Sequence, residues 1–315
     1  MKLVSIRQGD LTVAGLLLEN EVLALSKASA AGEDIAGLPT TVIGILQAGQ
    51  PAVARLRELA SRLERDGTLM DQLRRSGALV ALDTVTLDAP IPVPGTLYAA
   101  GMNYRDHLEE MKTPVPKEPF VFLKGVASVA GPADDIVRPE GHDAMVDWEG
   151  ELAVVIGKEC HKVSEAEALD CVAGYMASND VSARDWVAAI QATPGVFEPI
   201  MNWDRNVLGK GFPTFCPLGP ALVTADEIPD PQNLKLVTRI DGETVQSSHT
   251  GNMVFPVARL IAHLAYWLVL RPGDVILTGT PAGVGVGRNP KRFLQPGEVV
   301  EVEIERIGKI ANTVA

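Results

Sequence analysis

Residues 147–156 read Asp-Trp-Glu-Gly-Glu-Leu-Ala-Val-Val-Ile, an apolar run that begins with alternating acidic residues. This pattern predicts a buried strand over residues 149–156, with Glu149 and Glu151 at its start. Alternate residues of a strand face the same side, so both carboxylates point together, about 6.5–7 Å apart along the backbone. Neighbouring anions are unfavourable unless water or a cation separates them, and oxygen ligands suit Mg²⁺, Mn²⁺ or Ca²⁺. The alternative interpretation is a solvated strand face.

A third carboxylate is available in residues 174–185, Gly-Tyr-Met-Ala-Ser-Asn-Asp-Val-Ser-Ala-Arg-Asp. Small and polar residues crowd this segment. It follows a helix predicted over residues 164–172, whose start carries a Ser-x-x-Glu capping box. Asp180 can therefore join the two glutamates. Because Asp and Asn also cap helices and make turns, a local cap at Asn179 or Asp180 is the competing interpretation.

A candidate general base lies in residues 101–110, Gly-Met-Asn-Tyr-Arg-Asp-His-Leu-Glu-Glu. If a helix begins at Asp106, His107 and Glu110 lie at positions i and i+3 on one face and can form a hydrogen bond. A carboxylate that orients a histidine raises its basicity, and such a histidine can activate water near neutral pH. The alternative is an exposed helix end.

Two glycine-rich segments are expected near a ligand. Lys210 lies between two glycines, so its backbone can approach a ligand closely and its ammonium can stabilise an anion. A solvent-facing lysine is the alternative. Residues 277–287 follow a predicted strand, but they contain no P-loop lysine and open no helix, which excludes a nucleotide fingerprint. His263, by contrast, lies in an apolar helix predicted over residues 254–268, and we expect it in the core.

The chain divides into a small N-terminal unit and a larger strand-rich one. Residues 1–88 contain three short strands and then apolar residues at helical spacing over residues 52–76, which predicts a small α+β domain. Three prolines between Pro90 and Pro94 make a stiff, extended crossing. Residues 89–315 lack a regular alternation of strands and helices, which predicts an α+β, β-rich domain and not a doubly wound fold. Strands are predicted in it over residues 97–100, 120–123, 149–156, 234–240, 275–278 and 299–304.

Composition excludes several classes of function. The 315 residues carry 28 Lys and Arg against 40 Asp and Glu, a net charge of −12. An acidic surface repels a phosphate backbone, so no nucleic-acid partner is expected. The apolar stretch over residues 260–270 is too short for a bilayer span of about 20 residues, so no membrane partner is expected. Three widely spaced cysteines and no N-terminal apolar signal segment predict a cytoplasmic protein without disulfides.

Taken together, these segments resemble the fumarylacetoacetate hydrolase family, in particular bacterial members with an N-terminal extension. The resemblance implies a mixed β-sandwich roll, assembled as a homodimer, in which three carboxylates hold Mg²⁺ or Mn²⁺. The matching motifs occur in the family's order over about residues 90–315: Gly101–His107 with Glu110, Asp147–Gly157, Gly174–Asp185, Gly209–Pro220, Gly251–Ala258 and Arg271–Gly287. By resemblance, the metal ligands are Glu149, Glu151 and Asp180, the dyad that activates water is His107 with Glu110, the lysine near the metal is Lys210, and the substrate-binding positions are Tyr104, Arg184 and Thr280.

The resemblance also implies a substrate class, since family substrates are small oxo acids, often with a 1,3-dicarbonyl unit. We expect metal-dependent hydrolysis of a C–C bond in an acylpyruvate-type oxo acid or diketone. His107 would be the base, and Lys210 and Thr280 would stabilise the oxyanion. One alternative is an oxo-acid decarboxylase or tautomerase on the same metal site, which needs no attacking water. Another is a catalytically silent metal-binding protein, which would need no base.

Two departures from the family pattern bear on the substrate. Relatives often carry Gln two residues after the Asp of Ala-Arg-Asp, where this chain has Val187. They also often read Lys-Ser-Phe-Asp, whereas Lys210 is followed by Gly-Phe-Pro, so a pocket hydrogen-bonding group and a carboxylate are missing. Residues 188–207 look long against short members. Because they contain Phe197, Met201 and Trp203, we expect a pocket that accepts a more apolar substrate.

Overall fold

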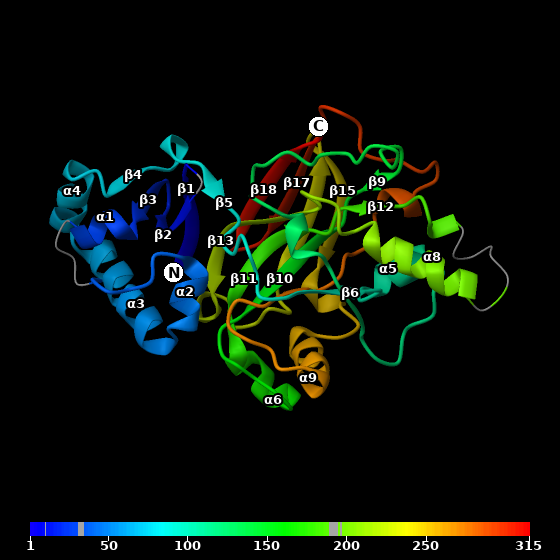
Figure 1. Ribbon diagram of the computed structural model, residues 1–315, viewed down its shortest axis with the longest axis horizontal. Coiled ribbons are helices and arrows are strands. Elements are labelled where there is room, and N and C mark those ends of the chain that lie inside the picture. The colour runs from blue at the N-terminus through cyan, green and yellow to red at the C-terminus, as the bar shows by residue number, and fades with distance from the viewer. Residues whose placement is uncertain (10, 31–34, 189–194, 196) are drawn as a thin grey trace.

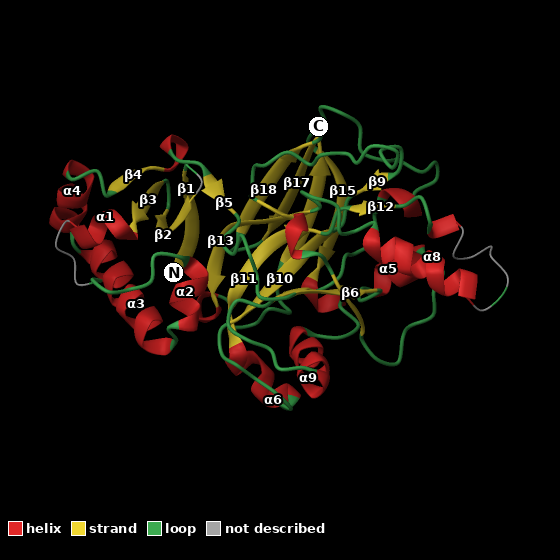
Figure 2. Ribbon diagram, viewed as in Figure 1, coloured by secondary structure: helices red, strands yellow, loops and turns green. Residues whose placement is uncertain are grey.

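The computed structural model describes the chain except residues 10, 31–34, 189–194 and 196. The first part of the chain contains β1 (Lys2–Gln8), β2 (Leu11–Leu18), β3 (Glu21–Ala24), α1 (Leu25–Ala30), α2 (Val42–Gln47), α3 (Gln50–Arg65), α4 (Gly67–Arg75), β4 (Leu79–Ala81) and β5 (Leu87–Asp88). The second part contains β6 (Leu97–Gly101), α5 (Arg105–Glu110), β7 (Phe120–Leu123), β8 (Val129–Ala130), β9 (Val146–Asp147), β10 (Gly150–Ile156), α6 (Glu165–Ala168), β11 (Val172–Asn179), β12 (Ser182–Ala183), α8 (Phe197–Leu208), β13 (Cys216–Thr224), β14 (Lys235–Ile240), β15 (Glu243–His249), α9 (Val257–Trp267), β16 (Val275–Leu277), β17 (Val299–Ile304) and β18 (Gly308–Thr313). The predicted α+β, strand-rich class is confirmed (Figure 2).

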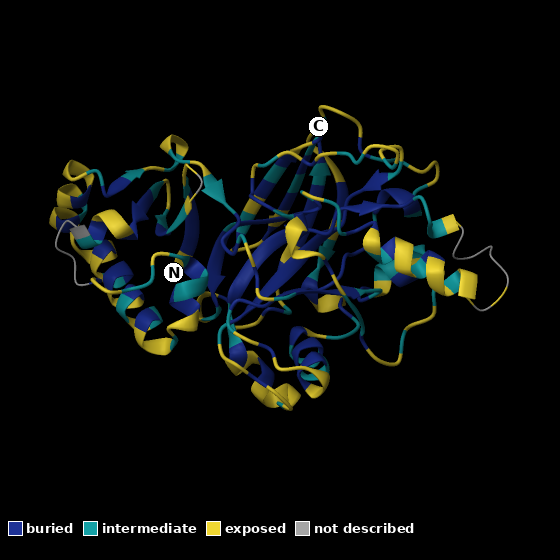
Figure 3. Ribbon diagram, viewed as in Figure 1, coloured by how far each residue is buried: buried dark blue, intermediate teal, exposed yellow. Residues whose placement is uncertain are grey.

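A large twisted sheet passes through the molecule, in the strand order β4-β3-β2-β1-β13-β11-β10-β16-β6-β7 (Figure 1). β5 pairs with β1, and β8 pairs with β13. A second sheet of order β15-β14-β17-β18 packs against its centre. Apolar side chains from both sheets, including Leu152 and Val154 of β10 with Leu236 of β14 and Val302 of β17, share one core cluster. The central strands are accordingly the most buried part of the molecule (Figure 3).

The three short strands predicted in the N-terminal part form an antiparallel meander. Leu3 pairs with Leu16, and Gly15 pairs with Ala24, which places β1, β2 and β3 side by side. α3 covers this meander with the apolar face that its spacing indicated. β1 also pairs with β13, with Lys2 opposite Val223, so the main sheet runs without a break from one part into the other. The boundary predicted after residue 88 falls at the end of β5 and stays a prediction.

Four strand ends meet at one edge of the sheet. Because β10 is antiparallel to β11, the start of β10 lies beside the end of β11, with Glu151 opposite Ser178. β16 is antiparallel to β10, so the residues that follow β16 come to the same edge. β6 is parallel to β16, which brings α5 there as well. Segments that are distant along the chain therefore converge at this edge.

Helix lengths and one core assignment differ from expectation. The helix predicted over residues 164–172 ends at Ala168, although its capping box is present, because the chain passes through a 3-10 turn into β11 at Val172. The helix predicted from residue 254 begins at Val257, since Pro256 occupies its N-cap and disfavours a helical residue before it.

The core position predicted for His263 is wrong. Its side chain is half-buried and lines an open surface groove with Tyr266 and Trp267. α9 is amphipathic, and its buried face is formed by Leu260, Ile261 and Leu264. Within the described ranges, no helix has both the length and the apolar character needed to cross a membrane.

We predict that Gly174→Ala destabilises the protein by about 1–3 kcal/mol, the usual cost of overpacking a core. A methyl group at Gly174 would lie 2.2 Å from the backbone oxygen of Val223, so β11 and β13 would have to separate. Gly67→Ala is the control, because a methyl group at Gly67 meets nothing within 4 Å. Urea unfolding measures both variants, and equal midpoints for them would contradict the prediction.

Candidate metal centre

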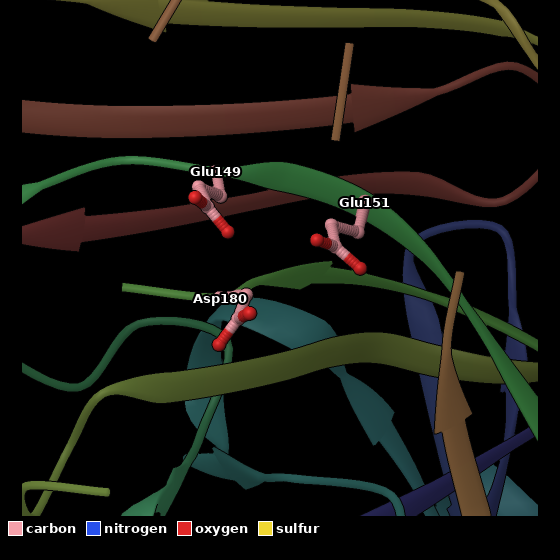
Figure 4. A group of neighbouring side chains, drawn as sticks. All are labelled: Glu149, Glu151 and Asp180. Atoms are coloured by element: carbon pink, nitrogen blue, oxygen red, sulfur yellow. The ribbon is translucent and has the colours of Figure 1, made fainter. Parts of the chain in front are cut away.

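Three buried carboxylates meet at the edge where the strands converge. Glu149 immediately precedes β10, Glu151 is the second residue of β10, and Asp180 immediately follows β11. Their exposed fractions are 6%, 1% and 2%, and one oxygen from each lies within 4.8 Å of the others (Figure 4). Asp180 donates its backbone N–H to Glu149 O at 2.9 Å, which fixes the spacing between the two segments. The helix cap considered for Asp180 is absent here, since this residue joins two strands.

Lys210 bridges two of the three carboxylates. Its Nζ donates to Glu149 Oε2 at 2.6 Å, to Asp180 Oδ2 at 2.7 Å and to Ser182 Oγ at 2.8 Å. An ammonium group has three N–H donors, so these three acceptors use all of them. The side chain is buried, which excludes the solvent-facing alternative.

Lys124, which the sequence analysis did not single out, binds the other carboxylate oxygen of Asp180. Its Nζ donates to Asp180 Oδ1 at 2.6 Å and to Val181 O at 3.3 Å, and it also donates to the backbone oxygen of Lys210. Its side chain is fully buried. Little in the sequence indicates that Lys124 is buried, because a lysine directly after an apolar strand and before a glycine is usually solvated.

Arg184 reaches the centre from β12's end and is held by two carboxylates. Its Nε donates to Asp147 Oδ2 at 3.0 Å, and its Nη2 donates to Glu149 Oε1. Asp147 is anchored in turn by the backbone N–H groups of Gly285 and Val286, at 2.6 and 3.0 Å. Arg184 therefore lines the cavity, as the resemblance implied, with part of its guanidinium already engaged.

Burial and charge drive the pKa values of the two glutamates in opposite directions. Burial, then the charges of Asp180 and Glu149, raise the pKa of Glu151 well above its usual range. Burial would also raise the pKa of Glu149, but the adjacent cations Lys210 and Arg184 outweigh it and lower that pKa. Two carboxylates two residues apart thus have different protonation behaviour, because only one of them contacts both cations.

The predicted histidine–carboxylate pair forms as expected. His107 Nδ1 lies 3.0 Å from Glu110 Oε2, and the N–H of Gly283 donates to Glu110 Oε1 at 3.0 Å. An ionised carboxylate can only accept, so Nδ1 carries the proton and Nε2 is left as the basic nitrogen. His107 lines the cavity together with the three carboxylates.

The cavity is small, with a volume of about 100 Å³. Its lining combines two kinds of side chain. The charged or polar ones are the three carboxylates, His107, Arg184, Lys210 and Thr280, and the apolar ones include Phe120, Phe122, Trp203 and Val207.

Three expected pocket residues lie elsewhere. Tyr104 is fully buried in the core and does not line the cavity, its hydroxyl has no hydrogen-bond partner among the described residues, and its substrate-binding role stays a prediction. Phe197 and Met201 are exposed by 74% and 52% and do not line the cavity, because they lie on the outer face of α8. Of the three apolar residues singled out in residues 188–207, Trp203 alone lines it; part of this stretch lies outside the described residues.

The residues present fit a divalent cation. All three candidate ligands are oxygens, which suit Mg²⁺ and Mn²⁺, with Ca²⁺ also possible. Among the described residues, the carboxylate of Glu151 accepts one hydrogen bond, from Gly279 N at 2.7 Å, so it retains free lone pairs. The buried cluster holds four carboxylates, with Asp147 included, against the three cations Lys124, Arg184 and Lys210. When all four carboxylates are ionised, one negative charge remains uncompensated, which a divalent cation would offset.

We predict that Glu151→Gln removes stabilisation by Mn²⁺ without destabilising the metal-free protein. A carboxyl with a raised pKa in the folded state contributes stability below its unfolded pKa, and that stability is lost as the pH rises through the folded pKa. Gln cannot ionise, so the unfolding temperature of metal-free wild-type protein should fall relative to the variant as the pH increases through this window. Mn²⁺ should then raise the unfolding temperature of the wild type and not that of Glu151→Gln.

Thermal unfolding with and without Mn²⁺ measures both effects. Glu109→Gln, which alters an exposed carboxylate on α5, is the control and should respond to Mn²⁺ like the wild type. Equal stabilisation of Glu151→Gln by Mn²⁺ would contradict the assignment of Glu151 as a ligand.

Comparison with known proteins gives one consistent result. A family model described as fumarylacetoacetate (FAA) hydrolase C-terminal matches residues 96–315. The Homo sapiens protein named oxaloacetate tautomerase FAHD2B, mitochondrial, is 44% identical over 279 residues, which cover 88% of this chain and 80% of that protein.

Solved structures show the same relationship over the whole chain. Fumarylacetoacetate hydrolase from psychrophilic Exiguobacterium antarcticum matches with a TM-score of 0.74 and 30% identity, covering 100% of this chain and 99% of that one. Maleylpyruvate hydrolase from Sphingobium sp. SYK-6, solved with manganese(II) ion and pyruvate, matches with a TM-score of 0.71 and 26% identity at the same coverage. The fold expected from the resemblance is thereby confirmed, and the chain belongs to the fumarylacetoacetate hydrolase family.

Proposed function

We propose that this protein is a divalent-metal-dependent tautomerase, which interconverts the keto and enol forms of a small 2-oxo acid of the oxaloacetate type. The observation that carries the proposal is a histidine–glutamate base facing a small cavity beside three carboxylates, while the two groups expected to stabilise an oxyanion have no donor to spare. Glu149, Glu151 and Asp180 would hold the metal. When bound there, Mg²⁺ or Mn²⁺ supplies Lewis acidity to the oxo and carboxylate oxygens of the substrate.

His107 would carry the proton between carbon and oxygen. Its Nε2 takes a proton from the carbon next to the oxo group and returns it to the enolate oxygen, and the reverse step uses the same path. Glu110 accepts from Nδ1–H throughout and stabilises the imidazolium that forms. Glu110 itself is held by the N–H of Gly283, so the ring is oriented before the substrate arrives.

The hydrogen bonds of Lys210 and Thr280 favour proton transfer over hydrolysis. C–C hydrolysis passes through a tetrahedral oxyanion, which requires free donors aimed at it. Lys210 already donates to three acceptors, and Thr280 Oγ1 donates to Gly150 O at 3.0 Å while it accepts from Gln246 Nε2 at 2.8 Å. Both residues therefore support the site by position and charge, and the oxyanion role expected for them would need their present hydrogen bonds to break.

Cavity size and similarity support the same substrate class. Pockets for drug-sized ligands are typically about 300–1,000 Å³, whereas the cavity here has about 100 Å³. The human relative that is 44% identical over 88% of this chain is named an oxaloacetate tautomerase. Tautomerisation also needs one base and no place for an attacking water.

Hydrolysis of a C–C bond in an acylpyruvate-type oxo acid is the second candidate. The same His107–Glu110 pair can deprotonate water, and two solved relatives are named hydrolases. Decarboxylation on the same site remains a third possible outcome of the assays below. The homodimer and the cytoplasmic location expected from the sequence also stay predictions.

We predict that the Mg²⁺- or Mn²⁺-loaded protein accelerates the enol-to-keto change of oxaloacetate and loses this activity with chelator. Ultraviolet absorbance of the enol measures the rate. An acylpyruvate incubated in parallel and analysed by mass spectrometry tests the second candidate, which would release pyruvate and a carboxylic acid. Cleavage of the acylpyruvate without any effect on oxaloacetate would reverse the order of the two candidates.

We predict that His107→Gln lowers the tautomerisation kcat by about 10²-fold or more, the usual effect of a general base. Mn²⁺ affinity should change little, because His107 is not one of the three candidate ligands. Titration calorimetry measures the affinity. Glu109→Gln, on the exposed side of the same helix, should keep wild-type kcat. A variant that loses Mn²⁺ affinity in proportion to kcat would show that His107 acts on metal binding instead.

A further inference from the structure

The inner face of α8 forms part of the cavity wall. Trp203, Asn206 and Val207 are spaced at i, i+3 and i+4, which places them on one face of the helix, and all three line the cavity. α8 then leads directly to Lys210, whose backbone N–H donates to Val207 O at 3.1 Å. The helix therefore connects the wall of the cavity to the ammonium that bridges the carboxylates.

Asn206 is the polar residue among the three α8 residues that line the cavity, since the other two are Trp203 and Val207. The ring of Trp203 lies beside that of Phe120, at a centroid distance of 5.3 Å. The residue is 9% exposed, and its amide forms no hydrogen bond with any other residue that the structure describes. Because Asn206 lines the cavity, its amide groups can hydrogen-bond a molecule bound there.

We propose that Asn206 is a specificity-determining residue, whose amide donates to an oxygen at the end of the substrate remote from the 2-oxo acid group. This inference rests on the proposed function, since the carboxylates define the end at which the oxo acid group binds. The charged residues that line the cavity are largely occupied with one another: Lys210 has no donor left, and Arg184 is engaged by Asp147 and Glu149.

The amide of Asn206 has two N–H donors and carries no full charge, so it can bind a substrate oxygen whether that oxygen is charged or neutral. Two kinds of substrate carry such an oxygen: a dicarboxylic oxo acid has a second carboxylate, and a diketo acid has a second carbonyl. A 2-oxo acid with an alkyl end has none and would leave the buried amide unpaired. Sites built on a buried hydrogen bond reject the analogue that lacks it.

The test compares three substrates on one measurement. Oxaloacetate, an acylpyruvate and 2-oxobutanoate are incubated with the Mn²⁺-loaded protein in D₂O, and NMR follows exchange of the C3 protons. For Asn206→Ala and Asn206→Leu, we expect kcat/KM for the two oxygen-bearing substrates to fall about 10-fold or more, mainly through KM, the loss expected for one hydrogen bond. Exchange of 2-oxobutanoate should change less than about two-fold, since it makes no such bond.

Asn202→Ala is the matched control. Asn202 lies one turn earlier on α8, is also buried and does not line the cavity. We expect it to keep the wild-type preference among the three substrates. Asn206→Asp separates the two oxygen sources, because a carboxylate there repels a second carboxylate more strongly than a carbonyl. Metal affinity, measured for every variant by Mn²⁺ titration, should stay within about two-fold of the wild type.

Equal losses for all three substrates in Asn206→Ala would assign Asn206 a structural role and overturn the inference, as would no loss at all. If the wild type exchanges none of the substrates, the proposed function fails, and the inference is judged by binding instead. Titration calorimetry then compares pyruvate with difluoro-oxaloacetate, which has a second carboxylate but no C3 proton. Asn206→Ala should weaken binding of the second ligand alone, and unchanged binding of both would refute the role of Asn206.

Discussion

The structure depends on the burial of opposite charges in one cluster. Charges removed from water are stable only when each is paired and hydrogen-bonded, and loss of one partner leaves another uncompensated. The three cations and three of the four carboxylates satisfy this condition here, since Asp147, Glu149 and Asp180 each contact at least one cation. The remaining negative charge is concentrated near Glu151, which contacts a backbone N–H and no cation. The pairing that stabilises the buried charges and the fit of the site to a divalent cation thus arise from the same cluster.

The cluster lies where strand ends meet at one edge of the sheet, and not on a face of the sheet. The start of β10, the end of β11 and the residues after β16 and β6 reach one edge, so a short stretch from each provides a different part of the site. α8 adds a second layer, because one helix carries part of the cavity wall and ends beside Lys210. One continuous segment of the chain therefore carries both part of the cavity lining and the lysine that bridges the carboxylates.

Local spacing explains which site residues were predictable from the sequence. Glu149 and Glu151 are two apart at a strand start, and His107 and Glu110 are three apart on a helix, so short-range geometry brings each pair together. The order of the motifs along the chain indicated the family, and through it the assignment of Asp180 as a third metal ligand. Lys124 was missed because its partners lie more than fifty residues away, and no local pattern separates a buried lysine from a solvated one. The sequence also did not reveal which face of α8 points into the cavity. Phe197, Met201 and Trp203 were all predicted to line it, and of these three only Trp203 does.

The pairing of β1 with β13 gives the N-terminal part a role beyond that of an appendage. Removing residues 1–88 would strip β13 of its neighbour and leave unsatisfied backbone groups along one side of the strand, beside the apolar side chains of Leu222 and Val223. Unpaired edge strands of this kind pair with strands of other chains and promote aggregation. Truncation after residue 88 would therefore yield an aggregation-prone fragment.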